Sequence, residues 1–545
     1  MSDLALIGDL AEAAPPGRER MAAGRVLEAV APGERVSLRD WVALMGAMLG
    51  AFMAVLDIQI TNASLNDILG SLGATLEEGS WVSTSYLVAE IIVIPLTGWL
   101  SDVFSARRYL LANAALFLVF SMACAWAWSL ESMIVFRALQ GFTGGVLIPM
   151  AFNLVLKLLP AAKRGLGFAL FGMTATFAPA IGPTIGGWLT DNYGWPAIFY
   201  LNLVPGVLLM SAVAWGLAPG KPRLALLRRG DWGGIGAMAI GLGSLIVFLE
   251  EGNRNDWLNS KFIVLLALTA ATFLSVCVVI ELKRREPFIN LRLLADRNFG
   301  IGTVISTAFG VGMYGAMYLL PVYLAQVQGY NAQQIGWTII WSGAPQLLMM
   351  PVAAALLRWF DARLLLTLGL ALFSGSSFMN AAMTNLTAYD QLILAQLVRA
   401  MGMPLVIVPL TSLATGHIGP QQAGSASALY NMFRNLGGSI GIALLATQLD
   451  LREKFHSVRL GEAVSLFHPA TNERLDTLTQ QFIARGAEAV AAAQQAVGAL
   501  AGTVRREAYV MAYADCFYLI GVLLLAMVLL VWMCGGAKGA TLAGH

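Results

Sequence analysis

Two carboxyl groups, Asp57 and Glu90, lie inside long apolar stretches of the sequence. Asp57 is the one ionisable side chain of the run 41–64, and Glu90 stands in the middle of the run 81–100. If these runs cross a bilayer, a charged aspartate at the centre costs ~2.5–3.5 kcal/mol even on the mildest insertion scales. Each carboxyl should therefore face a cavity, be protonated, or both. The chemistry this offers is to hold a proton when shielded from water and to release it when water enters.

The residues around Asp57 favour a cavity. Thr61 and Ser64 follow it at helical spacing on one face, and Gln59 and Asn62 lie on a neighbouring polar stripe. A helix with this much polarity lines water or ligand rather than lipid. We interpret Asp57 as a proton carrier. The alternative is an aspartate held permanently in an ion pair or hydrogen-bonded to its own helix.

Three arginines, Arg137, Arg399 and Arg434, also lie within apolar runs. Arg137 is the natural partner for a nearby carboxylate, because a close positive charge stabilises the ionised form. Glu90 is either a second proton site or a contact for a cationic substrate. Arg434 either contacts anionic substrates or holds a packing network.

The composition indicates a membrane protein. Hydrophobic residues make up 58% of the 545 residues and charged residues 12%, against about 25% charged residues in soluble proteins. A net charge of +2 argues against a nucleic-acid partner. The four histidines and four cysteines show no ligand or disulfide spacing, so we expect no metal site and no catalytic residue. No phosphate-binding loop is present, so nothing suggests that ATP drives the protein, and the sequence predicts no cofactor.

Apolar runs long enough to span ~30 Å of hydrocarbon recur along the chain. All must be helices, because lipid offers no partner to a bare backbone. The sequence thus predicts an all-α integral membrane protein with fourteen spans: 41–64, 81–100, 108–128, 132–157, 163–190, 196–216, 232–250, 261–281, 298–320, 332–357, 363–383, 388–416, 421–449 and 509–534.

Basic residues predict the orientation. With both termini in the cytoplasm, the short outer loops hold only Arg254 and Lys261, and the loops and termini on the cytoplasmic side are rich in lysine and arginine. The outer segment 450–508 is long and mixes charge with alanine, so it is exempt from this rule. We expect this segment to be helical, as a solvated cap or as a docking surface.

The chain also repeats. Trp81 pairs with Trp337 and Arg107 with Arg363 at a constant offset, which indicates two six-helix bundles in parallel orientation around an extra helix pair. Parallel repeats are a transporter architecture, with the substrate site near the midplane. The predicted organisation is a cytoplasmic segment 1–40, a first bundle 41–216, two linker helices 232–281, a second bundle 298–534 that contains the periplasmic segment 450–508, and a cytoplasmic tail 535–545.

Four motifs resemble those of the major facilitator superfamily. "GWLSDVFSARR" at 98–108 is similar to its loop between helices two and three, and "RALQGFTGG" at 137–145 to its fourth-helix motif. The stretch 172–206 resembles the fifth-helix antiporter motif, and "LDIQITNASL" at 56–65 resembles the first-helix motif of fourteen-helix drug/proton antiporters of EmrB/QacA type. The chain is most similar to the EmrB-like branch.

The resemblance implies roles for motif residues. Gly98, Asp102, Arg107 and Arg108 would form a cytoplasmic gate, although Ser105 stands where the family has glycine and Val103 where it has a basic residue. The alternative for the two arginines is simple anchoring at the membrane surface. The antiporter motif would be carried by Pro179, Gly182, Pro183, Gly186 and Gly187, for which close helix packing is the alternative.

The function implied is proton-coupled export of hydrophobic or amphipathic compounds across a bacterial inner membrane. An EmrB-like pump would work with a periplasmic adaptor protein and an outer-membrane channel. A proton-coupled importer on the same fold, or a multi-spanning enzyme or sensor, are the alternatives. A pliable cavity suits methionine and aromatic side chains. The expected lining is Asn62, Trp81, Tyr86, Glu90, Met313, Tyr314, Tyr318, Trp341, Gln346, Asn431, Met432 and Arg434.

Overall fold

The computed structural model describes residues 36–228, 230–284, 287–419 and 422–535, and this part of the chain contains helices and no strand. The prediction of an all-α protein is confirmed. The predicted terminal segments fall almost wholly on residues 1–35 and 536–545, which lie outside the described residues.

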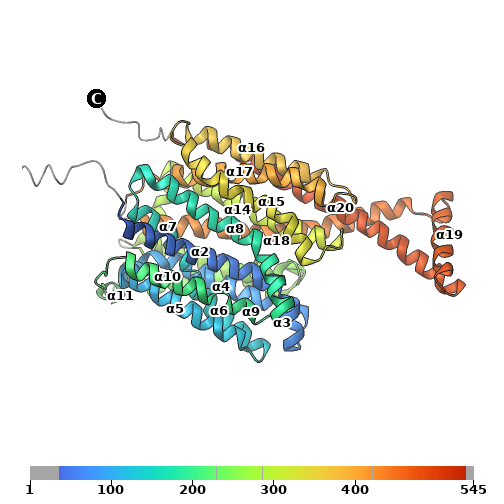
Figure 1. Ribbon diagram of the computed structural model, residues 1–545, viewed down its shortest axis with the longest axis horizontal. Coiled ribbons are helices and arrows are strands. Elements are labelled where there is room, and N and C mark those ends of the chain that lie inside the picture. The colour runs from blue at the N-terminus through green and yellow to red at the C-terminus, as the bar shows by residue number, and fades with distance from the viewer. Residues whose placement is uncertain (1–35, 229, 285–286, 420–421, 536–545) are drawn as a thin grey trace, which may run out of the picture. The chain divides into compact units, whose positions relative to one another are not determined.

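Each of the fourteen predicted runs corresponds to a helix or to a pair of consecutive helices (Figure 1). These are α2 Leu38–Ala63, α4 Leu76–Phe104, α5 Ala106–Ala125, α6 Leu130–Gly144 with α7 Leu147–Leu158, α8 Ala161–Tyr193, α9 Ala197–Tyr200 with α10 Leu203–Gly216, α12 Trp232–Gly252, α13 Lys261–Lys283, α14 Arg297–Gln326, α15 Ala332–Leu356, α16 Ala362–Ala381, α17 Tyr389–Thr415, α18 Ala423–Ala463 and α20 Ala489–Val531. Shorter elements connect them: α3 Leu65–Leu72, α11 Ala225–Arg228, η1 Trp257–Asn259, η2 Leu291–Ala295 and α19 Pro469–Ala484.

Within the described chain, twelve helices are long and apolar enough to cross a membrane, and thirteen if the two pieces of α8 form one span. The helix outside this count is α18, which carries glycine, asparagine and arginine along its first half and charged residues along its second. It nevertheless packs against α14, α20 and α4. Its polar side chains are buried against these neighbours. The composition of α18 alone therefore does not show that it belongs to the helix bundle.

α8 bends by 43° between Lys163–Pro179 and Ile181–Tyr193. Pro179 and Pro183 flank the bend. Proline removes a backbone donor and its ring clashes with the preceding turn, which is the usual cause of a sharp kink. The bend leaves α8 in contact with both α15 and α17.

Helix contacts define two groups and the seam between them. In the first group α6 packs against α4 and α5, and α10 packs against α5; in the second, α16 packs against α17 and α20, and α14 against α18. The two groups meet where α8 packs on α15 and α4 packs on α18. The extra pair, α12 and α13, packs together and contacts α4 and, through α12, α18.

One end of this seam is tightly closed. A Cβ added to Gly98, near the end of α4, would lie 2.8 Å from backbone atoms of Gly424, at the start of α18. The Ser427 hydroxyl donates to the Pro149 carbonyl oxygen at 2.9 Å. Backbone is therefore packed against backbone at the end where α4 finishes and α18 begins.

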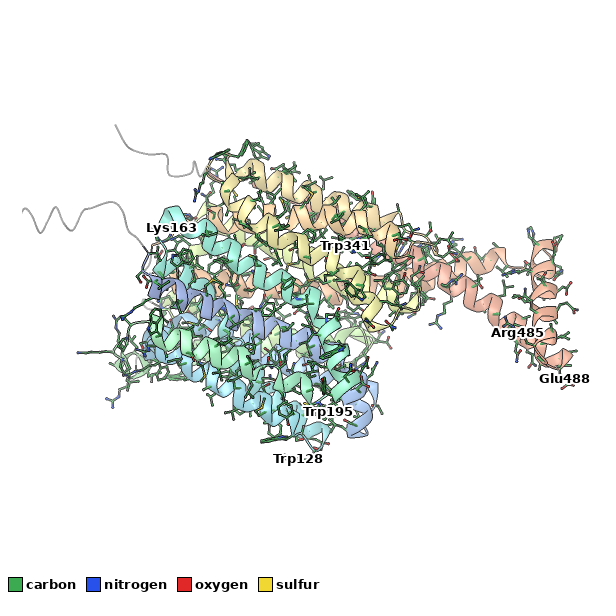
Figure 2. The ribbon with its side chains drawn as sticks, in the orientation of Figure 1. Trp128, Lys163, Trp195, Trp341, Arg485 and Glu488 are labelled. Carbon is green, nitrogen blue, oxygen red and sulfur yellow. The ribbon has the colours of Figure 1, made fainter. Side chains whose placement is uncertain are left out.

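The predicted outer segment 450–508 is helical, as expected, and it projects from the bundle. α18 continues to Ala463, α19 crosses the tip, and α20 returns from Ala489 (Figure 1). Arg485 and Glu488 lie at this tip (Figure 2). Lys163 lies at one end of the bundle, whereas Trp128 and Trp195 lie at the other (Figure 2).

Candidate functional site

Asp57 forms a buried ion pair with Arg137. The Arg137 Nη1 atom lies 2.6 Å from Asp57 Oδ2, and the two side chains are 1% and 2% exposed. The pair links α2 to α6. Asp57 is paired in this state, which both the proton-carrier interpretation and the alternative of a permanent ion pair allow.

Neutral amides complete the shell around the Asp57 carboxylate. Gln140 Nε2 donates to Asp57 Oδ1 at 3.0 Å, and Asn202 Nδ2 donates to the same oxygen at 2.7 Å. Gln140 also accepts from Arg137 Nη1 at 2.8 Å. Asn202, between α9 and α10, is held by its contact with Ser121 Oγ at 3.0 Å. Both carboxylate oxygens are thus hydrogen-bonded, the condition under which a charge is tolerated away from water.

Gln140 and Asn202 were not among the predicted site residues. Gln140 lies one helical turn after Arg137 in the fourth-helix motif, and this spacing was a usable signal. Asn202 lies in the loop-like break before α10, where an asparagine is too common to stand out.

The Tyr86 ring covers the other side of Arg137, with the guanidinium carbon 4.3 Å from the ring centre. This cation–π contact adds to the ion pair. Gly141 and Gly144 lie directly against Tyr86, so α6 approaches α4 closely here. Tyr86, predicted to line the substrate cavity, therefore lies inside the first group of helices, beside the ion pair.

Glu90 lies one turn further along α4, 5% exposed. It forms no ion pair or hydrogen bond within the described residues, and the cations whose charges act on it are Arg137 and Arg434. A Cβ on Gly145 would lie 2.9 Å from the Glu90 Cα, so the α6–α7 junction packs against this turn. Glu90 is a buried carboxyl without a fixed partner.

Arg434, on α18, lies across the seam from Glu90. Its Nη2 donates to Asn431 Oδ1 at 3.0 Å, and its guanidinium carbon lies 5.4 Å from the Phe171 ring centre on α8. Its charge also acts on Tyr314 of α14. The charge of Arg434 therefore acts on groups of both halves, Glu90 of α4 and Tyr314 of α14.

The ion pair at the predicted gate differs from the expected one, in which Asp102 pairs with Arg107 and Arg108. Asp102, on the last turn of α4, contacts Lys157 at the end of α7, with 3.2 Å between Oδ1 and Nζ. No ion pair joins it to Arg107 or Arg108 in the described chain. The reason is geometric, because α4 and α7 are packed together whereas the two arginines begin the next helix.

The chain reverses at Ser105 with φ 71°. This is backbone that glycine adopts freely and serine does not. The departure from the family pattern at this position therefore has a conformational cost.

The antiporter-motif glycines pack α8 against α2. A Cβ on Gly182 would lie 2.5 Å from the Gln59 Cβ, and one on Gly186 would lie 3.0 Å from the Ile60 carbonyl oxygen. Gly187 is half-buried on the same helix. These contacts agree with the packing interpretation and place the motif beside the helix that carries Asp57.

A small enclosed cavity of about 40 Å³ lies between the halves. Its polar lining is Gln59 from α2, Ser342 from α15 and Arg399 from α17, and Pro179 and Pro183 of the antiporter motif complete the α8 side. The sequence identified Arg399 as a basic residue within a span but gave it no role.

The other predicted lining residues are scattered. Asn62 accepts from Ser83 Oγ at 2.6 Å between α2 and α4, whereas the Trp341 indole donates to Tyr389 Oη at 2.7 Å and is 37% exposed on the outside of α15. Gln346 donates to the Ser342 carbonyl oxygen. Of the remainder, Met313, Asn431 and Met432 are buried, and Trp81 and Tyr318 are half-buried. None of these residues lines the small cavity described above.

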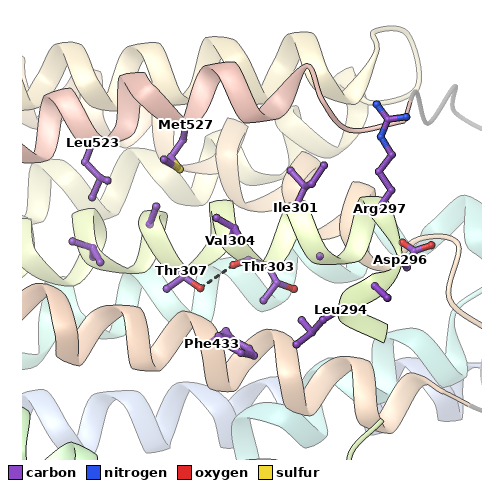
Figure 3. Close-up of a pocket in the computed structure, with 14 residues that line it drawn as sticks. Leu294, Asp296, Arg297, Ile301, Thr303, Val304, Thr307, Phe433, Leu523 and Met527 are labelled. Atoms are coloured by element: carbon purple, nitrogen blue, oxygen red, sulfur yellow. Dashed lines mark hydrogen bonds between the residues drawn. The ribbon is translucent and has the colours of Figure 1, made fainter. Parts of the chain in front are cut away.

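A separate apolar groove of about 720 Å³ lies beside α14, between η2 and the helices α18 and α20 (Figure 3). Phe433, Leu523 and Met527 contribute to its wall, and Asp296 and Arg297 lie at one end. None of the residues predicted to bind substrate lines it. Among the described residues there is also no cluster of three metal-ligating side chains.

The sequence matches the family described as the Major Facilitator Superfamily over residues 47–442. The colistin resistance protein EmrB of Acinetobacter baumannii is 34% identical, covering 81% of this chain and 86% of that protein. The fatty acid resistance protein FarB of Neisseria gonorrhoeae is 31% identical, covering 90% of this chain and 95% of that protein. The multidrug export protein EmrB of Haemophilus influenzae is 31% identical, covering 89% of this chain and 93% of that protein.

Among solved structures, the human organic anion transporter MFSD10 (TETRAN) aligns with a TM-score of 0.59, covering 90% of this chain and 99% of that one. The two sequences are 13% identical. This likeness concerns the fold alone.

Proposed function

Because this chain belongs to the major facilitator superfamily, and to its EmrB-like members, we propose that it exports hydrophobic or amphipathic compounds in exchange for protons. It is a multi-pass membrane protein, and we assign it to a bacterial inner membrane. The single observation that carries the proton coupling is the buried ion pair between Asp57 and Arg137.

We assign fourteen spans to the chain, with α8 as one bent span and α18 as the fourteenth. Support for α18 comes from its packing between α14, α20 and α4. The two helix groups would be parallel repeats, 41–216 and 298–534, with α12 and α13 as the linker pair 232–281. Both termini would be cytoplasmic, so that the end sealed by Gly98 and Gly424 is the cytoplasmic gate.

With that orientation, the present state is closed toward the cytoplasm. Backbone contact between α4 and α18 seals the cytoplasmic end, and a small cavity of about 40 Å³ lies between the halves. Export requires this seal to open so that substrate reaches the Glu90 and Arg434 region from the cytoplasm. The halves would rock about the α8–α15 contact.

The ion-paired state of Asp57 is the proton-free state, since a protonated carboxyl gives up most of its attraction to Arg137. Protonation would therefore loosen the α2–α6 link, and re-forming the pair would expel the proton. Asp57 lies in the last two turns of α2, whose far end we assign to the outside. Protons would reach it from that side and leave to the cytoplasm.

Glu90 is a second candidate for coupling. A carboxyl buried without a partner is held at lower cost in its neutral form than as an anion. A cationic substrate that replaces the proton would restore a charge pair in the same place. Both roles proposed for Glu90, proton site and cation contact, are versions of this exchange.

We also propose that the projecting segment meets a periplasmic adaptor protein, which would pass substrate to an outer-membrane channel. Exposed apolar side chains support a docking role. Leu466 and Phe467 at the start of the tip are 68% and 98% exposed.

Dye efflux in everted membrane vesicles tests the proposal. Wild type should accumulate a hydrophobic dye when a proton gradient is imposed and should lose it on collapse of the gradient. Asp57→Asn should abolish uphill transport, and Glu90→Gln should reduce it at least for cationic dyes. Asp390→Asn, an exposed carboxyl at the outer end of α17, is the matched control and should pump normally.

Two outcomes would refute the proposal. If Asp57→Asn and Glu90→Gln both pump uphill as well as wild type, neither carboxyl couples the proton. If the imposed gradient drives dye out of everted vesicles instead of into them, the protein is an importer.

A further inference from the structure

Arg399 is a buried cation without a partner. It is 3% exposed on α17, and its Nε and Nη1 atoms have no hydrogen-bond acceptor. No carboxylate of the described chain forms an ion pair with it or acts on its charge. An unpaired charge is expensive to bury, so such a group in a native protein points to something that binds it.

Arg137 provides the comparison within the same chain. The sequence "RAL" at 137–139 is matched by "RAM" at 399–401 in the second half, and Asp57 neutralises Arg137 at 2.6 Å. Arg399 lies on α17, which packs against α8, α14, α15 and α16, and α2 contributes Gln59 to the cavity beside it. The acidic residues of these helices are Asp40, Asp57, Asp191 and Asp390. Asp57 is engaged by Arg137, and the other three stand at helix ends. The second half therefore keeps the arginine and lacks the acid.

Arg399 is one of the residues that line a cavity between the halves. The enclosed space of about 40 Å³ is lined by Arg399 together with Gln59 and Ser342. A water molecule needs about 10–15 Å³ by this kind of measure, so the cavity holds roughly three waters or one small polar group. Arg399 and Ser342 come from the second half and Gln59 from the first, so an occupant would contact both halves.

We propose that Arg399 is the anion-binding group of the transport path and that its ligand is the carboxylate of a single-chain amphiphile. The inference rests on the proposed export function and names a substrate class for it. A carboxylate has three heavy atoms, fits the cavity, and accepts two parallel hydrogen bonds from a guanidinium. The Gln59 amide supplies a donor from the opposite half.

The apolar part of such a ligand also has a place. Ala316, Met317, Leu320 and Ile339 make up most of the remaining wall. A short acyl chain would extend along these side chains when the halves separate. Four apolar side chains offer contact for one acyl chain, so we assign a single-chain, fatty-acid-like ligand rather than a phospholipid.

The test uses the purified full-length protein in lipid nanodiscs, with octanoate as probe and methyl octanoate as its uncharged match. Binding is measured by the ligand-dependent shift of the thermal unfolding midpoint. Wild type should bind octanoate about ten- to a hundredfold more tightly than the ester, because the ester lacks the charge-assisted contact. Arg399→Gln should lose this preference, and Arg399→Lys should keep part of it. Arg358→Gln, an exposed arginine at the end of α15, should behave as wild type.

The proposal fails if wild type binds the ester as well as octanoate, a comparison that needs no variant to fold. It also fails if Arg399→Gln keeps the carboxylate preference, if chloride displaces octanoate at equal concentration, or if anionic phospholipid in the nanodisc abolishes octanoate binding. The last two results would identify a small ion or a lipid phosphate as the occupant. Vesicle efflux of an uncharged dye separates the anion-site proposal from the proposed export function. If the dye is pumped but octanoate binding does not depend on Arg399, only the anion site is refuted. If octanoate binds through Arg399 but no dye is pumped, only the export function is refuted.

Discussion

Replacing Asp57 by asparagine removes the charge that neutralises Arg137 and keeps the size of the side chain. Arg137 then retains the Gln140 amide oxygen at 2.8 Å and the Val82 carbonyl oxygen at 3.4 Å as acceptors. Neither is charged. The converse variant, Arg137→Gln, leaves the Asp57 carboxylate with the amide donors of Gln140 and Asn202.

Both side chains are almost fully shielded, at 1% and 2% exposure, so solvent screening does not reduce the effect. Removing one partner of a buried pair costs about 3–5 kcal/mol. We expect the lower end, about 3 kcal/mol for each single variant, because uncharged partners remain on both sides. Removing both charges is often close to neutral, so the double variant should lose far less than the sum. We expect the double variant, which still buries two uncharged polar groups, to lose about as much as one single variant, about 3 kcal/mol, so the coupling energy should also be about 3 kcal/mol.

A double-mutant cycle on the free energy of unfolding measures this coupling. The four proteins are unfolded reversibly by a denaturing detergent in mixed micelles and followed by circular dichroism. A coupling below about 0.5 kcal/mol would mean that the two residues act independently. That result would refute the ion pair on which the mechanism depends.

Three further substitutions test other parts of the account. Gly98→Val should separate α4 from Gly424 and leave the cytoplasmic end open, which labelling of an engineered cysteine at that end would detect as faster reaction. Ser105→Gly should relieve the backbone at φ 71° and raise the free energy of unfolding by about 1 kcal/mol, measured in the same micelles. Gly182→Val should push α8 away from Gln59 and reduce dye efflux, and Gly182→Ala should also reduce it because a Cβ alone would lie 2.5 Å from the Gln59 Cβ. Unchanged efflux in both variants would argue against close packing at this position.

Much of the helical architecture follows from the sequence because apolar run length is a strong signal. Every predicted run has a helical counterpart, and the segment 450–508 is helical as expected. The count of spans is harder to predict. α18 hides its asparagines and arginine against neighbouring helices, and composition cannot register a neighbour that lies far away in the sequence.

The polar sites divide in the same way. The partnership of Asp57 with Arg137 could be expected, since a buried carboxylate needs a cation and few were available. The donors Gln140 and Asn202 could not, because their direction depends on helix rotation and on the break before α10. For the same reason Asp102 contacts Lys157 rather than the arginines next to it in the sequence.

Arg399 illustrates the opposite case. Its sequence position suggested nothing, and its significance comes from what surrounds it: a small cavity, no acid and two donors without acceptors. A missing partner is visible only when all neighbours are placed. The missing partner of Arg399 can therefore be recognised only in the folded structure.

The central claim is that Asp57 gives up a proton as substrate binds. Counting the protons released when a hydrophobic dye saturates the purified protein in weakly buffered solution tests it most directly. The account predicts release of about one proton per bound dye from wild type and none from Asp57→Asn. Equal release from both proteins, or release that disappears only in Glu90→Gln, would contradict it.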